Sequence, residues 1–259
     1  MSASGFPESL LRRVEDAGLN ASAPPQQLWM DGWIVRLSPG KAKRARCINA
    51  VAAGHLPLDE QLARCAAVFR EAGLPLVVRI TPYTQPHTLD ATLAERGWTA
   101  FDHTRVMVLD SLKGLPPDNR PEALTETVAR PQAYAEAVGA LRGSSPVEMA
   151  AHAERLAASP VPYTGLIWER DGQGLACGQF ARAGELAGLY DVFTAPAHRG
   201  QGLARGLCAA LLCRARAEGA QAAYLQVDSA NPPARAVYAR LGFRDGYGYH
   251  YRAEEAGDH

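Results

Sequence analysis

Residues Tyr190 to Arg205 read YDVFTAPAHRGQGLAR, and this stretch decides the fold more than any other. The apolar pattern of a strand ends at Thr194, Pro196 stops strand pairing, and a helical pattern opens at Gly202. Small residues let backbone N–H groups approach an anion, and a helix N-terminus adds unpaired N–H groups and the positive end of its dipole. The stretch therefore predicts a phosphate-binding cradle, with a glycine-rich turn before a structural helix as the alternative.

Two common phosphate-binding classes fit the stretch poorly. A P-loop needs a lysine after its last glycine, but the chain has no lysine after Lys113. A dinucleotide-binding fold is closer, because Gly200 and Gly202 fit a relaxed glycine pattern and Asp228 follows the next strand pattern. The strand of such a fold usually runs directly into the first glycine, whereas residues 195–199 intervene here. The sequence thus disfavours both classes.

A second motif lies downstream of the cradle. Residues Leu225 to Phe243 read LQVDSANPPARAVYARLGF, which is a strand pattern followed by a helical pattern that contains Asn231, Ala234 and Tyr238. Taken alone, Asn231 before a proline is a good helix N-cap, and Tyr238 is a residue that a helix buries in the core. The fixed spacing between these residues favours a functional interpretation.

The two motifs together resemble those of the Gcn5-related N-acetyltransferase (GNAT) superfamily. Its acetyl-CoA loop has Gln or Arg, two residues, Gly, one residue, then Gly or Ala, which Arg199, Gly202 and Ala204 match. The second motif matches the N-x-x-A-x-x-x-Y-x-x-x-G-F pattern of the family from Asn231 to Phe243. The resemblance implies an α+β fold with a mixed sheet, and it covers the chain from about residue 119 to the C-terminus.

The resemblance also implies roles for individual residues. It assigns pairing with the pantetheine arm to the backbone of Val192, Phe193 and Thr194, contact with that arm to Asn231, and protonation of the leaving thiolate to Tyr238. A phenol remains protonated at neutral pH and can donate to a thiolate. The pyrophosphate is expected on backbone amides of the cradle residues, which are Arg199, Gly200, Gln201, Gly202, Leu203 and Ala204.

The sequence departs from the family where a general base is often found. Glutamate is customary at two positions, which are Gln226 and Gly188 in this chain. Neither residue can accept a proton, so Asp191, Asp228 or His198 is expected to act through water, or the amine arrives neutral. The acidic limb of the rate profile is expected to follow the substrate amine or an unusual group.

A stretch rich in Gly and Pro, Ser111 to Pro121, divides the chain into a segment 1–112 and a segment 119–259. Leu93 to Trp98 (LAERGW) resembles Tyr238 to Phe243 (YARLGF), and each follows a helical pattern and precedes a strand pattern. We therefore expect two GNAT-like modules in tandem, of which the first is degenerate, has no cradle and binds no cofactor.

The degenerate first module is expected to support the second. Its position matching Tyr238 is Leu93, which cannot donate a proton. Residues such as Trp33, Arg79 and Tyr83 are candidates for one wall of the amine pocket, or for structural roles. The basic segment Ser38 to Arg46 is expected to be a solvated loop, with contact to the 3'-phosphate of CoA as the alternative.

Composition excludes several other classes. The 27 Lys and Arg residues balance 27 Asp and Glu residues, so no net positive field attracts nucleic acid or an anionic membrane. No apolar run is long enough to span a bilayer and no signal peptide is visible, which predicts a cytoplasmic protein. The five cysteines contain no C-x-x-C pair, and no histidine spacing typical of a metal site occurs, so no metal is expected.

These observations predict an acetyl-CoA-dependent N-acetyltransferase acting on a primary amine of a small molecule or peptide. Direct attack in a ternary complex is expected, because no cysteine lies in the motifs as an acyl carrier. A non-catalytic acyl-CoA-binding regulatory protein is the alternative. The amine and the oligomeric state stay open.

Overall fold

The computed structural model describes residues 5–40, 42–115 and 120–254, so residues 116–119 of the predicted linker lie outside the described residues. The first half contains α1 (Glu8–Ala21), β1 (Gln27–Met30), β2 (Trp33–Arg36), a 3-10 helix (Lys43–Ala45), β3 (Ile48–Ala50), α2 (Leu58–Glu71), β4 (Val78–Ile80), α3 (Leu89–Glu95) and β5 (Thr99–Leu109).

The second half contains β6 (Thr125–Ala129), α4 (Pro131–Arg142), α5 (Pro146–Ala157), β7 (Tyr163–Arg170), β8 (Gln173–Ala183), β9 (Leu186–Thr194), a 3-10 helix (Pro196–His198), α6 (Leu203–Ala217), β10 (Ala222–Asp228), α7 (Pro232–Arg240) and β11 (Arg244–Ala253). Helix ends follow local chemistry. Gly143 ends α4 in the left-handed conformation, and a capping box between Ser145 and Glu148 starts α5.

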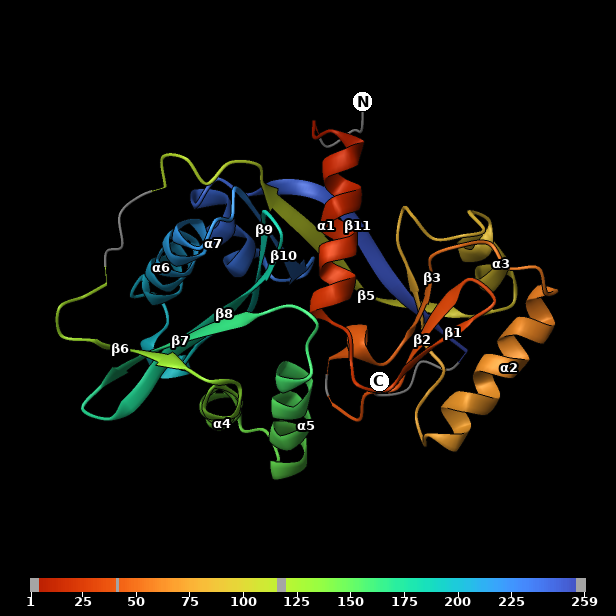
Figure 1. Ribbon diagram of the computed structural model, residues 1–259, viewed down its shortest axis with the longest axis horizontal. Helices are drawn as coiled ribbons and strands as arrows, with labels where there is room; N and C mark the ends of the chain where they lie inside the picture. The colour runs from red at the N-terminus through yellow and green to blue at the C-terminus, as the bar shows by residue number, and fades with distance from the viewer. Residues whose placement is uncertain (1–4, 41, 116–119, 255–259) are drawn as a thin grey trace.

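One mixed sheet of eleven strands crosses the molecule among the described residues (Figure 1). The strand order is β1-β2-β3-β4-β11-β5-β10-β9-β8-β7-β6. The sheet is antiparallel except for two pairs, β3 with β4 and β9 with β10, each of which is joined by a crossover helix. Strands β7, β8 and β9 form an antiparallel meander.

The two halves repeat the same order of elements. In each half, two antiparallel pairings are followed by a crossover helix (α2 or α6), a parallel strand, a short helix (α3 or α7) and a final strand (β5 or β11). The final strands are exchanged: β11 lies between β4 and β5, and β5 lies between β11 and β10. The expected tandem arrangement is therefore present, with each half completed by a strand from the other.

Helices cover both faces of the sheet. Helix α6 packs on one face of the second half through Leu207 and Leu211, which belong to the same core as Phe180. Helices α4 and α5 pack on the opposite face through Tyr134 and Leu156. Helix α1 lies on this second face too, over the central strands (Figure 1). Helices α2 and α3 enclose a separate core in the first half.

The helical pattern expected before Leu93 to Trp98 is found as α3, whereas β1, β3 and β6 were not predicted. These three strands have only three to five residues. Such elements show too few turns or alternations for a periodic pattern to stand out. Their pairing with longer strands supplies the stability that the local sequence lacks.

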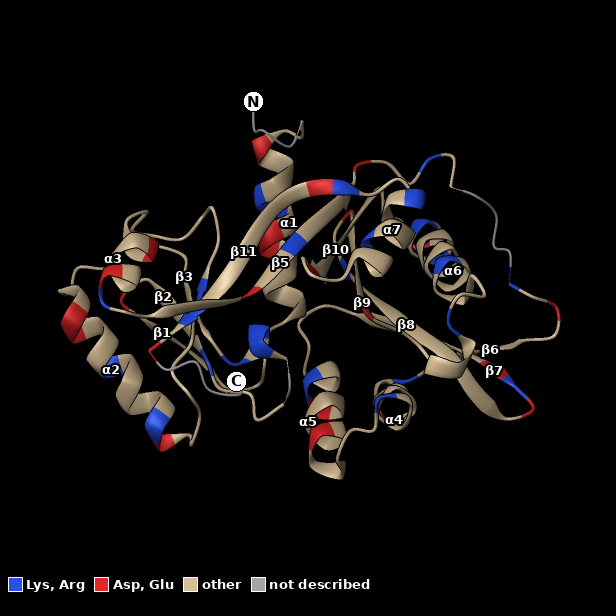
Figure 2. Cartoon of the chain, turned by 180° about the vertical axis from the view of Figure 1, so that it is seen from behind, with Lys and Arg blue, Asp and Glu red and all other residues tan. Residues whose placement is uncertain are grey.

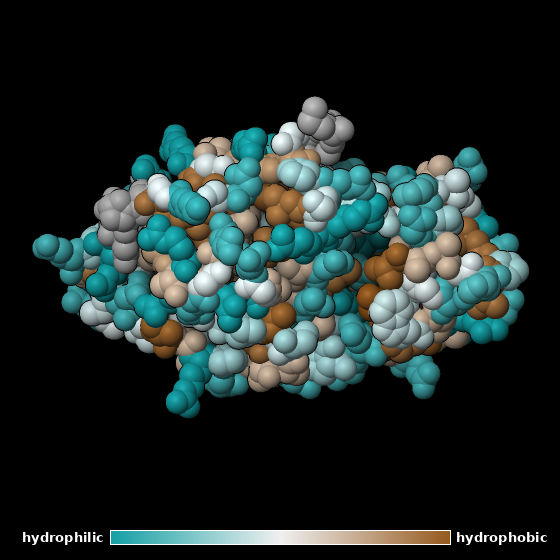
Figure 3. Space-filling view, turned by 45° about the horizontal axis from the view of Figure 1, so that its top comes forward, coloured by the Kyte–Doolittle hydropathy of each residue, from teal (hydrophilic) through white to brown (hydrophobic). Residues whose placement is uncertain are grey.

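Charged and apolar residues are mixed in the views of Figure 2 and Figure 3. Basic and acidic residues are interspersed over helices and strands (Figure 2), in agreement with the balanced composition. On the face shown in Figure 3, hydrophilic side chains surround small separate hydrophobic spots. Among the residues that the structure describes, no helix combines the length and the apolar character needed to cross a membrane.

The exchanged strands predict that the halves cannot be separated. A fragment beginning at residue 120 lacks β5, so the facing edges of β10 and β11 lose their hydrogen-bond partners. We expect this fragment to aggregate when expressed alone. Cleavage of the whole chain at a protease site inserted between Leu115 and Arg120 should instead leave both pieces in one complex, which size-exclusion chromatography with light scattering can measure. A monomeric, folded fragment 120–259 would contradict this expectation.

Candidate active site

The strands β9 and β10 part in the middle of the sheet. Their parallel pairing begins at Leu186 with Ala222 and ends at Leu189 with Leu225, although both strands continue. Phe193 and Thr194 are paired with β8 on one edge, while no strand among the described residues pairs with the other edge of residues 192–194. This is the place where the resemblance expects Val192, Phe193 and Thr194 to pair with an extended ligand arm.

A β-bulge in β9 lies directly before these three residues. Gln179 pairs with Tyr190 and Cys177 with Phe193, so two residues of β9 face one residue of β8. Asp191, the first bulged residue, has a φ of 52°, in the left-handed region. Aspartate tolerates this conformation better than most residues do, because its short side chain can form local hydrogen bonds. The bulge shifts the Asp191 side chain toward α4 and α5.

The predicted cradle follows the parted strand. Gly200 and Gly202 have φ values of 77° and 80°, which require glycine, and Gly202 is the N-cap of α6. The first N–H groups of α6 therefore face an open site, with Leu203 buried beneath them and Ala204 half-buried. Arg199 donates from Nε to the Thr194 carbonyl at 3.3 Å, which fixes the start of the turn. The turn and the start of α6 therefore have the backbone conformation that the predicted cradle requires.

The second motif lies beside the cradle. Asn231 caps α7, because its Oδ1 accepts a hydrogen bond from the Ala234 amide at 3.1 Å. Tyr238 is half-buried on α7, where its ring packs against Phe243. Burial, and secondarily the nearby Cys208 thiol, raises the pKa of Tyr238 above its ordinary value. The hydroxyl therefore stays protonated at neutral pH and can act as a donor.

Tyrosine side chains contact both positions where a glutamate is customary. A Cβ atom on Gly188 would lie 2.6 Å from the Tyr224 hydroxyl and 2.7 Å from the Tyr190 ring, so no side chain fits. Gln226 accepts a hydrogen bond from the Tyr249 hydroxyl at 2.8 Å. Both positions are therefore occupied by tyrosine contacts instead of a proton acceptor.

Asp191 is the centre of a charged network on the other side of β9. Its carboxylate contacts Arg142 at 3.0 Å, Gln179 at 2.7 Å and Nε2 of His152 at 3.1 Å. Burial raises the pKa of Asp191, but the contact with His152 and the charges of Arg142 and Arg155 outweigh it, so the pKa lies well below its ordinary value. A carboxylate held so firmly in its ionised form is a poor proton acceptor.

The first half borders this region through an unexpected segment. A cavity of about 110 Å³ is lined by Ser38, Gly40 and Ala42 from the first half, and by α4, α5 and Asp191 from the second. A second cavity, of about 300 Å³, lies beyond Ala42 and is lined by Lys43, Asp228 and several further residues, namely Arg44, Asp102, Thr104, Tyr249 and Tyr251. The N-terminal half therefore does wall the space beside the parted strands.

This finding decides between two alternatives and corrects one expectation. Trp33 is fully buried in the core of the first half, and Arg79 and Tyr83 line a different cavity, so the three residues take the structural alternative and do not form this wall. The described residues of the segment Ser38 to Arg46, which are all but residue 41, do not form the solvated loop that was expected. Arg44 donates to the Tyr249 hydroxyl at 3.3 Å, and Ala45 is completely buried. Basic residues in sequence gave no sign that the segment packs against β11.

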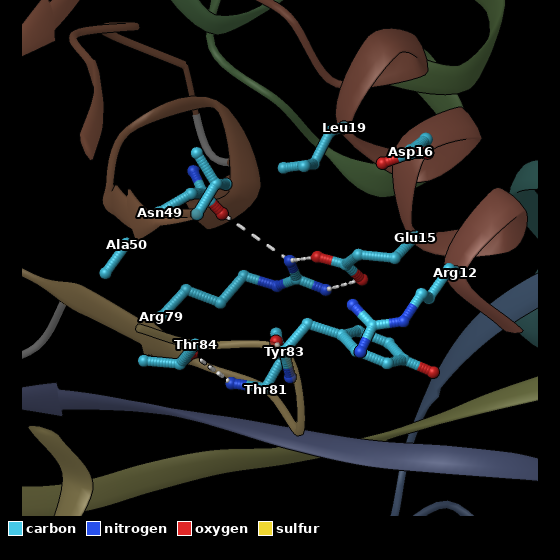
Figure 4. Close-up of a pocket in the computed structure, with 11 residues that line it drawn as sticks. Arg12, Glu15, Asp16, Leu19, Asn49, Ala50, Arg79, Thr81, Tyr83 and Thr84 are labelled. Atoms are coloured by element: carbon cyan, nitrogen blue, oxygen red, sulfur yellow. Dashed lines mark hydrogen bonds and ion pairs between the residues drawn. The ribbon is translucent and has the colours of Figure 1, made fainter. Parts of the chain in front are cut away.

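The first half contains a counterpart of the parted strands. The parallel pairing of β3 with β4 ends at Asn49 and Arg79, and a cavity of about 200 Å³ opens beyond it (Figure 4). Here the chain fills its own gap, because the Gln85 amide donates to the Ala50 carbonyl at 2.8 Å. The edge that would receive a ligand arm is therefore already used.

A buried ion pair occupies the same cavity. Arg79 donates to Glu15 of α1, with one contact of 3.1 Å, and Nη1 also approaches Asn49 (Figure 4). Burial raises the pKa of Glu15, but Arg79 and the Tyr247 hydroxyl hold it below its ordinary value. This pair joins α1, β4 and β11 and is structural.

The crossover helix of the first half also lacks a cradle. Helix α2 follows Pro57 and carries Asp59 and Glu60 in its first turn, where they would repel a pyrophosphate. Together with the filled gap, this supports the prediction that only the second half binds a cofactor.

Sequence reasoning missed His152, whose contact with Asp191 joins residues on different elements. The other acceptors considered lie elsewhere: Asp228 caps a turn through the Ala230 amide, and His198 lies in the 3-10 helix before the cradle. In the part of the chain that the structure describes, no group of three or more His, Cys, Asp or Glu side chains is arranged to hold a metal ion.

Several solved structures share this architecture. A GCN5-related N-acetyltransferase from Kribbella flavida superposes with a TM-score of 0.69 at 20% identity, covering 95% of each chain. A tandem GNAT protein from the clavulanic acid biosynthesis pathway gives a TM-score of 0.58 at 17% identity, covering 77% of this chain and 70% of the other. A GCN5-related N-acetyltransferase from Sphaerobacter thermophilus gives 0.58 at 16%, covering 75% and 66%. The chain therefore has the GNAT fold.

No curated protein matches the sequence significantly. One family model, described as "Probable histone acetyltransferase Rv0428c C-terminal", matches residues 8–252, which is nearly the whole chain. The chain therefore belongs to this family of GNAT-type acetyltransferases.

Proposed function

We propose that the protein is an acetyl-CoA-dependent N-acetyltransferase whose acceptor is a primary amine of a small molecule or peptide. The observation that carries the proposal is the parting of β9 from β10 directly before the cradle of Gly200 and Gly202. An extended thioester substrate needs such a free strand edge for its arm and backbone N–H groups for its pyrophosphate. Retention of Tyr238 beside the cradle favours catalysis over mere binding.

Each step of direct acetyl transfer is assigned to particular residues of the chain. Residues 192–194 would align the thioester, and their N–H groups would polarise its carbonyl. The cradle from Arg199 to Ala204 would hold the pyrophosphate, and Asn231 would contact the arm near the start of α7. Tyr238 would donate a proton to the departing thiolate. The family description names histones, which makes a protein lysine one of the candidate acceptors for this chain.

The cradle can be tested with Ala204→Glu. We expect acetyl-CoA affinity to fall at least tenfold, about 1.4 kcal/mol, because the new carboxylate repels the pyrophosphate. The fold should persist, since an acidic residue in the first turn of a helix is favourable. Isothermal calorimetry measures the affinity, and Ala204→Gln adds similar bulk without charge as the matched control. Unchanged affinity in the glutamate variant would remove the cradle assignment.

The general acid can be tested with Tyr238→Phe. Turnover should fall roughly 100-fold, the effect typical of general acids, while acetyl-CoA affinity stays nearly constant because only a hydroxyl is lost. Tyr83→Phe, a half-buried tyrosine of the first half, is the control. Full turnover of the Tyr238 variant, with chemistry shown to be rate-limiting, would mean that Tyr238 is structural.

One acetyl-CoA should bind to each chain. In the gap between β3 and β4, the Gln85 amide already donates to the Ala50 carbonyl. The negative charges of Asp59 and Glu60 in the first turn of α2 would repel a pyrophosphate. Native mass spectrometry of the whole chain with excess acetyl-CoA counts the bound molecules. Two equivalents per chain would show that the first half retains a site.

A further inference from the structure

His152 lies where an acceptor would approach the parted strands. It projects from α5 and lines the cavity of about 110 Å³ that Ser38, Gly40 and Ala42 close from the first half. The same cavity reaches Asp191, which directly precedes the three residues expected to align the thioester. An amine entering this cavity would therefore meet His152 beside the reacting carbonyl.

The imidazole ring of His152 lies against the Asp191 carboxylate. Nε2 of His152 lies 3.1 Å from Oδ2 of Asp191, an ion-pair distance without hydrogen-bond geometry, and Nε2 itself is buried. The side chain as a whole is 17% exposed, so the ring meets the cavity through its other atoms. A carboxylate beside Nε2 favours the tautomer with a proton on Nε2, which leaves Nδ1 with a free lone pair.

Asp191 is itself fixed by its neighbours. Arg142 and Gln179 donate to it at 3.0 and 2.7 Å, so the carboxylate is immobile and ionised. The arrangement matches a base oriented by a carboxylate, in which the carboxylate keeps its charge and the imidazole moves the proton.

We propose that His152 is the general base that deprotonates the acceptor amine, with Asp191 as its positioning residue. This inference deepens the proposed function and rests on it. The customary glutamate positions are Gly188 and Gln226 in this chain. The proposal places the proton acceptor on helix α5, on the cavity side of β9.

The proton balance closes without another reagent. Nδ1 takes one proton from the ammonium, and the free nitrogen lone pair forms the C–N bond with the thioester carbonyl carbon. When the C–S bond breaks, its electron pair stays on sulfur, which takes a proton from Tyr238. The bound nitrogen loses its second proton, through solvent, to the Tyr238 oxygen. The imidazolium then releases its proton to solvent.

Several charged and titratable groups surround the ring. They are Asp191 on β9, Arg142 and Tyr134 on α4, and Glu148 and Arg155 on α5. Glu148 is engaged at the N-terminus of α5, where it accepts from the Ser145 amide at 2.8 Å. Arg155 is nine-tenths buried. Asp191 is the group that contacts the ring nitrogen directly.

The test compares the whole wild-type chain with His152→Gln. Glutamine keeps a donor for Asp191 but takes no proton. Acetylation of ethylamine, spermidine and a lysine peptide should slow roughly 100-fold at pH 7, whereas trifluoroethylamine, which is largely neutral there, should lose much less. Acetyl-CoA affinity should not change. The wild-type acidic limb should have one onset for all amines, while the limb of the variant should move with the pKa of each amine.

Two further variants separate chemistry from structure. His55→Gln alters another His–Asp pair, with Nδ1 of His55 3.3 Å from Asp31, and should leave every rate unchanged. Asp191→Asn keeps a residue that accepts positive φ but removes the buried charge that Arg142 contacts, so it should lower the thermal midpoint as well as kcat, and its rates are compared at a temperature where both proteins are folded.

The outcomes distinguish the two proposals. A loss in His152→Gln that is equal for all amines and at every pH would show a structural role and overturn this inference. Equal rates in wild type and variant would overturn it as well, with the proposed function intact. A wild-type chain that binds acetyl-CoA but acetylates no amine would overturn the proposed function, and this inference with it.

Discussion

The antiparallel pair of β5 and β11 is the constraint on which the rest of the structure depends. It runs from Thr99 with Ala253 to Val108 with Arg244, and each strand completes the sheet of the other half. Because β5 occupies one edge of β10, strand β10 is held firmly there and can part from its neighbours only on the β9 side. The position of the parted strands, and hence of the candidate site, therefore depends on a strand encoded before the linker.

Signals confined to consecutive residues were predictable. The cradle at Gly200 and Gly202 and the cap at Asn231 follow from local backbone requirements, which sequence displays directly. The strand order was not predictable, because the linker after β5 marks a break in composition and says nothing about which strands share hydrogen bonds. The division into residues 1–112 and 119–259 describes the chain order, whereas β5 pairs on both sides with strands from the second segment.

The contacts of the charged residues at the site were also not predictable from the sequence. Asp191 in a strand-like sequence resembles a solvated side chain, and only the bulge at φ 52° directs it toward α4 and α5. Arg44 lies in a segment that reads as a basic loop, yet packing against β11 places its guanidinium on Tyr249. A single sequence shows the charge of such residues. Their partners are set by tertiary contacts between elements that lie far apart along the chain.

Three tyrosines contact the two positions where a glutamate is customary, so the proposed proton acceptor lies elsewhere. Tyr190 and Tyr224 share a hydrogen bond of 2.9 Å directly behind Gly188, and Tyr249 engages Gln226. A side chain at position 188 would collide with these phenols, so no carboxylate fits there, and at position 226 the side chain is an amide. On the cavity side of β9, by contrast, Arg142 and Gln179 stabilise the charge of Asp191 beside an open space. His152 on α5 therefore provides the proton acceptor that positions 188 and 226 lack. Residues Ser38, Gly40 and Ala42 of the first half close one side of the cavity that His152 lines.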